Sequence, residues 1–179
     1  MNSEEAAATQ NPYAAPIADL AIAPDASDIQ VFERFSAWAV FGLMVVTIWF
    51  YGYYWLYTRA KTLNTVVEDK ISDSFISITI WGSVTMSAIG LVFPSLIIIG
   101  FEFGATSPMF ELVRSLLGFV FAIMAIVLAF KMKSRLNIVT GSEQGDKTFC
   151  GSVGTFFLSA IYLQHKINRS IDLAETTAA

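Results

Sequence analysis

Long apolar stretches alternate with short polar segments along this chain. The apolar stretches predict helices at about residues 36–57, 75–100, 112–130 and 149–163. A helix needs roughly 20 mostly apolar residues to cross a bilayer, so the first three are long enough and the last, with about 15, is short. The stretches are apolar on every side, whereas barrel strands alternate apolar and polar positions. The pattern therefore predicts an all-α, polytopic helical membrane protein with three to four hydrophobic helices, each satisfying its own backbone hydrogen bonds.

The pattern also divides the chain into three regions. Residues 1–27 are rich in Ala, Pro and acidic side chains and predict a disordered tail. A helical membrane domain is expected over residues 28–169, and a flexible tail over 170–179. Ser27 and Gln30 have the spacing of a capping box, which predicts a short helix leading into the first span.

Composition narrows the class of protein. The 179 residues are 55% hydrophobic and 15% charged, with a net charge of −4, against roughly 25% charged residues in soluble domains. No basic face is present, which argues against a nucleic-acid partner. The single Cys150 excludes an intrachain disulfide. The first twenty residues contain no Lys or Arg and no apolar core, so no signal peptide is expected.

A line of small residues in the third stretch predicts a helix-packing face. Its members follow a 3-4-3-4 spacing, which places them on one side of a helix: Ser115, Gly118, Ala122, Ala125 and Ala129. Small residues let two membrane helices approach closely. The partner helix is either in this chain or in another.

Hydroxyl side chains follow each other along the second stretch. Thr79, Ser83 and Ser87 form either a polar seam that lines a path, or hydroxyls bonded to carbonyls within the helix or across a helix contact. Pro94 removes one backbone hydrogen bond and is expected to kink this helix.

The end of the first stretch is dense in aromatic side chains, followed by two bases. The members of this group are Trp49, Tyr53, Tyr54, Trp55, Tyr57, Arg59 and Lys61. Aromatic rings and snorkelling bases at a helix end are typical of a membrane interface. A cage for a cation or a quinone is the alternative.

The interiors of the predicted spans lack ionisable side chains that could carry out catalysis or proton transfer. No acidic or basic side chain and no His lies in the interior of any of them, although proton-coupled carriers normally keep such a group at depth. His165 is the only His, so a metal site has no second imidazole. The sequence therefore predicts no catalytic, cofactor-binding or metal-binding residues, and we expect the protein not to be an enzyme.

Three short motifs together resemble a known pattern. They are Asn-Pro-Tyr-Ala-Ala-Pro at residues 11–16, the Tyr- and Trp-rich stretch 51–57, and Tyr-Leu-Gln-His-Lys-Ile-Asn at residues 162–168. The chain resembles small bacterial inner-membrane proteins of unknown function that share this tail, first helix and ending. The resemblance implies a bacterial inner membrane and implies no activity.

Charge near the span ends predicts the orientation. Bases gather in the links after the first and third stretches, which the positive-inside rule places in the cytoplasm. Three segments also end in a base followed by an aliphatic-Asn pair, at Asn64, Asn137 and Asn168. If like endings share a side, the N-terminus lies outside, three helices cross, and the segment 149–163 dips and returns. Four crossings with both termini outside are the alternative.

These features predict a non-enzymatic role in the bilayer. The protein would act through helix contacts with itself or with a larger membrane protein. The alternative is a small channel or carrier for an uncharged or lipid-like solute.

Overall fold

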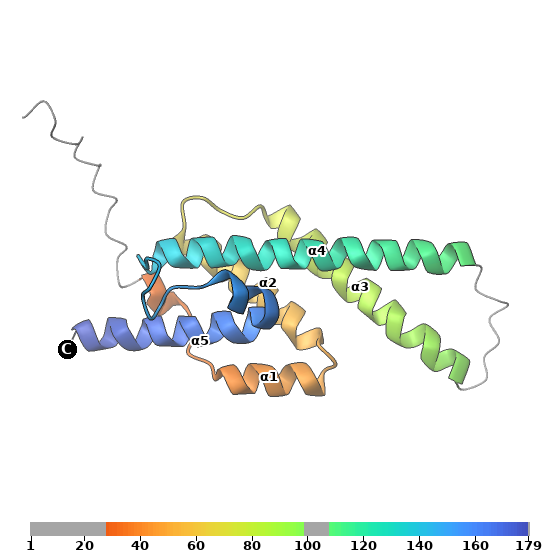
Figure 1. Ribbon diagram of the computed structural model, residues 1–179, viewed down its shortest axis with the longest axis horizontal. Coiled ribbons are helices and arrows are strands. Elements are labelled where there is room, and N and C mark those ends of the chain that lie inside the picture. The colour runs from red at the N-terminus through yellow and green to blue at the C-terminus, as the bar shows by residue number, and fades with distance from the viewer. Residues whose placement is uncertain (1–27, 99–107, 179) are drawn as a thin grey trace, which may run out of the picture.

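The computed structural model describes residues 28–98 and 108–178, and every regular element within them is a helix. The elements are η2 (Asp28–Val31), α1 (Ala37–Val46), α2 (Phe50–Val66), α3 (Asp73–Ile98), α4 (Pro108–Val139) and α5 (Ser152–Ala178) (Figure 1). The predicted all-helical class is confirmed. The predicted N-terminal tail and Ser27 lie outside the described residues, and the expected short helix is the single turn of η2.

The segment predicted as one helix over 36–57 is a helical hairpin. The chain breaks between α1 and α2, where Ile48 and Trp49 have φ values of 49° and 71°. Such left-handed conformations are unfavourable for branched and bulky residues, and local hydrogen bonds hold them here. The Trp49 N–H donates to the carbonyl of Met44 at 2.6 Å, and the hydroxyl oxygen of Thr47 accepts from the N–H of Tyr51 at 2.9 Å.

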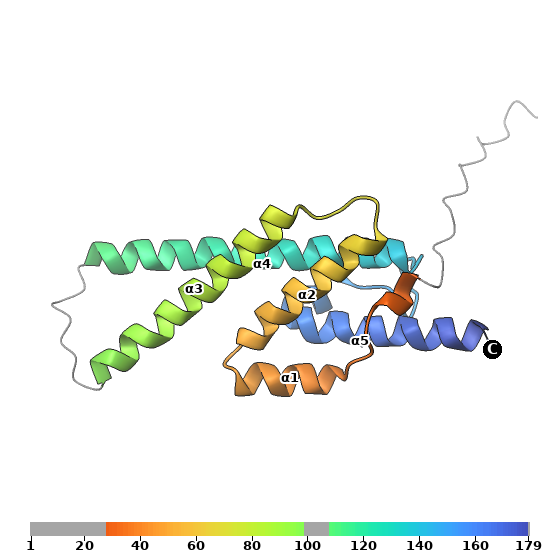
Figure 2. The same ribbon diagram turned by 180° about the vertical axis from the view of Figure 1, so that it is seen from behind.

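The pair α3 and α4 forms a second, longer hairpin. Both helices are long and apolar enough to cross a membrane, and they extend well beyond the other helices on one side of the molecule (Figure 2). The helix α3 starts and ends within a few residues of the predicted 75–100, while α4 extends the predicted 112–130 at both ends. Pro94 lies inside α3.

A third hairpin lies within α5. Ser159 has a non-helical backbone (φ 8°, ψ −87°), which divides the helix into a short arm at 152–158 and a long arm at 160–178. The N–H of Gly151 donates to the hydroxyl of Tyr162 at 2.9 Å. Eleven residues of straight helix would separate them by roughly 16 Å, so the short arm folds back on the long one. The long arm continues through the predicted tail 170–179 as far as Ala178, with Ser170 and Ile171 buried.

A glycine lets the two arms of each hairpin touch. A Cβ atom on Gly52 would lie 3.0 Å from Cε of Met44, and one on Gly82 would lie 2.0 Å from a ring carbon of Phe121. In the third hairpin, a Cβ on Gly154 would lie 2.6 Å from the Tyr162 ring. Close arm-to-arm contact is therefore common to all three hairpins.

The core joins the hairpins at one end of the molecule. Side chains from the residue after η2 and from the returning arm of every hairpin line a small gap in this packing: Phe32, Leu63, Met132, Leu136, Leu163 and Ile167. Ten of the eleven Lys and Arg residues gather at this end, and only Arg114, on α4, lies far from it. We therefore call it the polar end. Those ten are Arg34, Arg59, Lys61, Lys70, Lys131, Lys133, Arg135, Lys147, Lys166 and Arg169.

Candidate functional site

Three asparagines at the polar end each bind the backbone of one residue in a segment that leads into a helix. Asn64, near the end of α2, accepts a hydrogen bond from the N–H of Ile71 at 2.8 Å. Its amide donates to the carbonyl of the same residue at 2.6 Å. Ile71 lies two residues before α3 begins.

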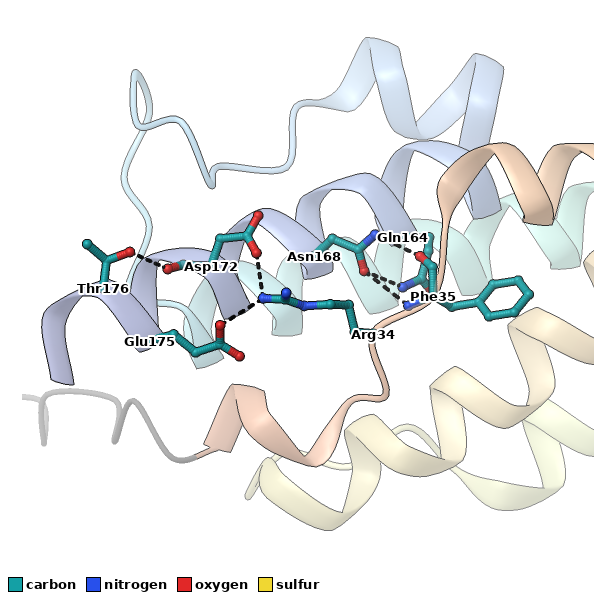
Figure 3. A network of polar contacts seen from close by, with 7 residues as sticks. All are labelled: Arg34, Phe35, Gln164, Asn168, Asp172, Glu175 and Thr176. Carbon is teal, nitrogen blue, oxygen red and sulfur yellow. Dashed lines mark hydrogen bonds and ion pairs between the residues drawn. The ribbon is translucent and has the colours of Figure 1, made fainter. Parts of the chain in front are cut away.

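The same arrangement recurs at the other two hairpins. Asn137 accepts from the N–H of Cys150 at 2.7 Å and donates to its carbonyl at 3.2 Å. Asn168 accepts from the N–H of Phe35 at 3.4 Å and donates to its carbonyl at 2.7 Å (Figure 3). Cys150 precedes α5 by two residues, and Phe35 precedes α1 by two.

These asparagine clamps link the hairpins into a closed ring. The first hairpin ends at Asn64, which holds the start of the second, and the second ends at Asn137, which holds the start of the third. Asn168 of the third hairpin then holds the start of the first. The matching sequence endings therefore meet at one end of the molecule.

Ion pairs and a polar network reinforce this closure. Arg34 pairs with Asp172 and Glu175 of α5 beside the Phe35 clamp (Figure 3). Asn168 also accepts from the side-chain amide of Gln164 at 2.9 Å. Arg135 donates to both the carbonyl and the carboxylate of Asp69. The contacts of Arg34 and Phe35 with α5 place the segments at both described ends of the chain side by side.

Burial governs the chemistry of the cysteine that Asn137 clamps. Cys150 is fully buried, and desolvation raises the pKa of its thiol to about 12, against a smaller opposing effect of Lys166 and Lys133. A thiol in this environment is protonated at neutral pH and is a poor nucleophile.

The predicted packing line on α4 lies in two environments. Ala129 is buried and Ala125 borders a cavity, whereas Ser115 and Ala122 are exposed. A Cβ atom on Gly118 would meet no other atom within 4 Å among residues 28–98 and 108–178. Gly82 and Phe121 make a close contact between α3 and α4 within this chain.

The hydroxyls of α3 face neighbouring helices. Ser87 shares a 3.1 Å hydrogen bond with the hydroxyl of Tyr53, and Ser83 lies 3.4 Å from the carbonyl oxygen of Phe121, to which it donates. Both also border a space of about 150 Å³ next to Gly118. Thr79 is fully buried, and its hydroxyl has no hydrogen-bond partner among the described residues.

The aromatic group does not form a single belt. Trp49 sits at the turn of the first hairpin, Tyr53 reaches Ser87 on α3, and Trp55 is buried against α5. Tyr54 is exposed and Tyr57 is half-buried.

The two bases of this group lie at the polar end. Arg59 donates to the carbonyl of Glu33, and Lys61 pairs with Asp73 at 2.8 Å. Tyr53, Tyr54, Trp55 and Tyr57 all lie on α2, between the turn at Ile48 and Trp49 and these two bases.

A cavity of about 230 Å³ lies where the three hairpins meet. Trp49 and Gly52 line it from the first hairpin, Ala125 and Ala129 from the second, and Thr155 and Ser159 from the third. Its lining is mostly apolar. The turns of the first and third hairpins therefore end beside the same part of α4.

A family model described as "Domain of unknown function (DUF4234)" matches residues 35–138. The chain belongs to this family. The DUF4234 match begins at Phe35, the first clamped residue, and ends one residue after Asn137. It thus covers the first two hairpins and leaves the third outside.

Two further comparisons, with curated proteins and with solved structures, gave no match.

Proposed function

We propose that this chain is an integral membrane protein that crosses the bilayer twice, through α3 and α4. The observation that carries the proposal is the exposure of two strongly apolar helices. Only 22% of the most apolar part of α3 and 11% of that of α4 is buried within the described chain. A core helix of a soluble protein would be mostly covered, so lipid is the medium that fits these surfaces.

The other two hairpins are too short to cross. With 10 residues, α1 is about 15 Å long, against roughly 30 Å of hydrocarbon. Its apolar side chains are nevertheless exposed, with Trp38 and Val46 each at 80%. The first and third hairpins therefore enter one leaflet and return, and the cavity marks the depth of their turns.

The charges set the orientation. Ten of the eleven bases lie at the polar end, which the positive-inside rule assigns to the cytoplasm. Both Phe35 and Asn168 lie there, so both ends of the described chain are cytoplasmic. This proposal replaces the expected topology with the N-terminus outside, because an Arg34–Asp172 pair cannot form across a bilayer. The membrane is a bacterial inner membrane.

The role we propose is non-enzymatic assembly within this membrane. Ser83 and Ser87 bond to neighbouring helices, which favours helix contact over a hydrated path through the second hairpin. The exposed part of the small-residue line, Ser115 to Ala122, offers a second helix a close approach. The partner is a second copy or a larger membrane protein.

Association in a mild detergent tests the role. Affinity purification of the tagged full chain should recover a second copy or a membrane partner. The Gly118→Leu variant should lose this association without a loss of its own thermal stability, because space is open there, whereas Phe119→Leu should retain it. Equal recovery with both variants would contradict the assigned contact surface.

A further inference from the structure

The cavity between the hairpins reaches toward the polar end along α4 and α5. Ala129 lines it on α4 and Thr155 lines it on α5. One helical turn nearer the polar end, α4 carries Lys133 and α5 begins at Ser152. The Lys133 ammonium donates to the Ser152 hydroxyl at 3.0 Å.

A second lysine lies at the same place. Lys166 stands over the Tyr162 ring, 5.5 Å from its centroid, and donates to the carbonyl of Lys147 at 2.8 Å. The start of α5 brings the two lysines together, because the N–H of Gly151, next to Ser152, donates to the hydroxyl of Tyr162 at 2.9 Å and Lys166 lies over the ring of that tyrosine. Over residues 28–98 and 108–178, neither lysine forms an ion pair, in contrast to Lys61 and Arg135.

We propose that this seam between α4 and α5 binds an anionic phospholipid of the cytoplasmic leaflet. Its phosphate lies between Lys133 and Lys166, and one acyl chain enters the cavity toward Ala125. The inference rests on the proposed membrane topology, which places the lysines at headgroup depth and the cavity in the hydrocarbon. A soluble anion would satisfy the lysines but would leave the apolar cavity unused.

Native mass spectrometry of the full chain in mild detergent tests the proposal. The protein is mixed with equal amounts of phosphatidylglycerol and phosphatidylcholine that have identical acyl chains. We expect the wild type to retain phosphatidylglycerol preferentially. Lys133→Gln and Lys166→Gln should each reduce that preference by about fivefold, the effect of one lysine near an anionic headgroup.

Matched variants separate the parts of the site. Lys131→Gln removes the same charge from the same helix, but Lys131 lies over Phe75 toward α3, so its lipid preference should be unchanged. Ala125→Leu fills the cavity and should reduce binding of both lipids. Glycerol 3-phosphate, which lacks acyl chains, should not displace bound phosphatidylglycerol.

Three outcomes would overturn the proposal. They are equal retention of the two lipids by the wild type, an equal effect of Lys131→Gln and Lys133→Gln, and displacement by glycerol 3-phosphate. The lipid measurement in detergent does not depend on orientation, whereas the topology is measured by labelling in cells. Failure of the lipid site is therefore distinguishable from failure of the proposed topology.

Discussion

The indole N–H of Trp55 donates a 2.9 Å hydrogen bond to the side-chain oxygen of Gln164. The two residues are 2% and 0% exposed, so this bond is shielded from water. It joins the returning arm of the first hairpin to that of the third. Gln164 also donates to Asn168, which connects the buried bond to the clamp on Phe35.

Removing the Gln164 amide should destabilise the fold. Gln164→Leu leaves the Trp55 N–H buried and unpaired, which costs about 1–3 kcal/mol. The measurement is thermal or SDS-induced unfolding of the purified protein in detergent. His165→Ala, at the exposed neighbouring position, should be neutral. Equal stability of the two variants would show that the buried bond is not important for stability.

Two glycines on the second hairpin should respond oppositely to Ala. A methyl group on Gly82 meets the Phe121 ring, and overpacking of this kind costs about 1–3 kcal/mol. Gly118 has open space, so Gly118→Ala should be neutral, or stabilising by up to about 1 kcal/mol through helix propensity.

A second substitution checks the origin of the Gly82 effect. In a Phe121→Ala background the ring is absent, so Gly82→Ala should lose most of its effect on unfolding. An unchanged effect in that background would contradict the assigned contact.

The buried hydroxyl of Thr79 predicts a variant that is not destabilised. Thr79→Val replaces an unpaired hydroxyl with a methyl group, which should leave stability unchanged or raise it by about 1 kcal/mol. The exposed Thr65→Val change on α2 is the control. A loss of more than about 1 kcal/mol at Thr79 would mean that its hydroxyl has a partner in the membrane.

Cys150 predicts a dependence of stability on alkaline pH. Its thiol has a pKa raised to about 12 in the fold, whereas an unfolded Cys ionises near pH 8.5. The unfolded chain therefore loses the proton first. The resulting stabilisation is complete below about pH 8.5 and falls by up to about 1.4 kcal/mol per pH unit above it.

The comparison is between the wild type and Cys150→Ala across pH 8 to 10.5. Other titrating groups cancel in the difference, which should shrink as the pH rises. A constant difference would show that the folded thiol ionises as readily as the unfolded one.

The sequence predicted the helices better than their connections. Length and apolar content were sufficient for α3 and α4. The aliphatic-Asn endings favoured one side for Asn64, Asn137 and Asn168, with four crossings as the alternative, and all three asparagines lie at the polar end. The break at Ile48 and Trp49 could not be predicted, because neither residue type favours a turn and the local hydrogen bonds that stabilise it depend on the folded hairpin.

The third hairpin and the cavity also could not be predicted from the sequence. The bend at Ser159 depends on the contact of Gly154 with Tyr162, eight residues away, which helical periodicity does not reveal. The cavity depends on three hairpin turns meeting at the same depth. The one sequence feature related to the cavity was the row of small residues on α4, because two of its members, Ala125 and Ala129, border the cavity.

Cysteine labelling in intact and lysed cells tests the central claim, two crossings with the start of the described chain and the segments before α3 and α5 in the cytoplasm. Single cysteines replace the exposed residues Gln30, Glu68, Gln144 and Met109 in a Cys150→Ala background. An impermeant maleimide should label Met109→Cys in intact cells and the other three variants only after lysis. Labelling of Gln30→Cys in intact cells, with Glu68→Cys still protected, would show that the first hairpin crosses the membrane and would contradict the account.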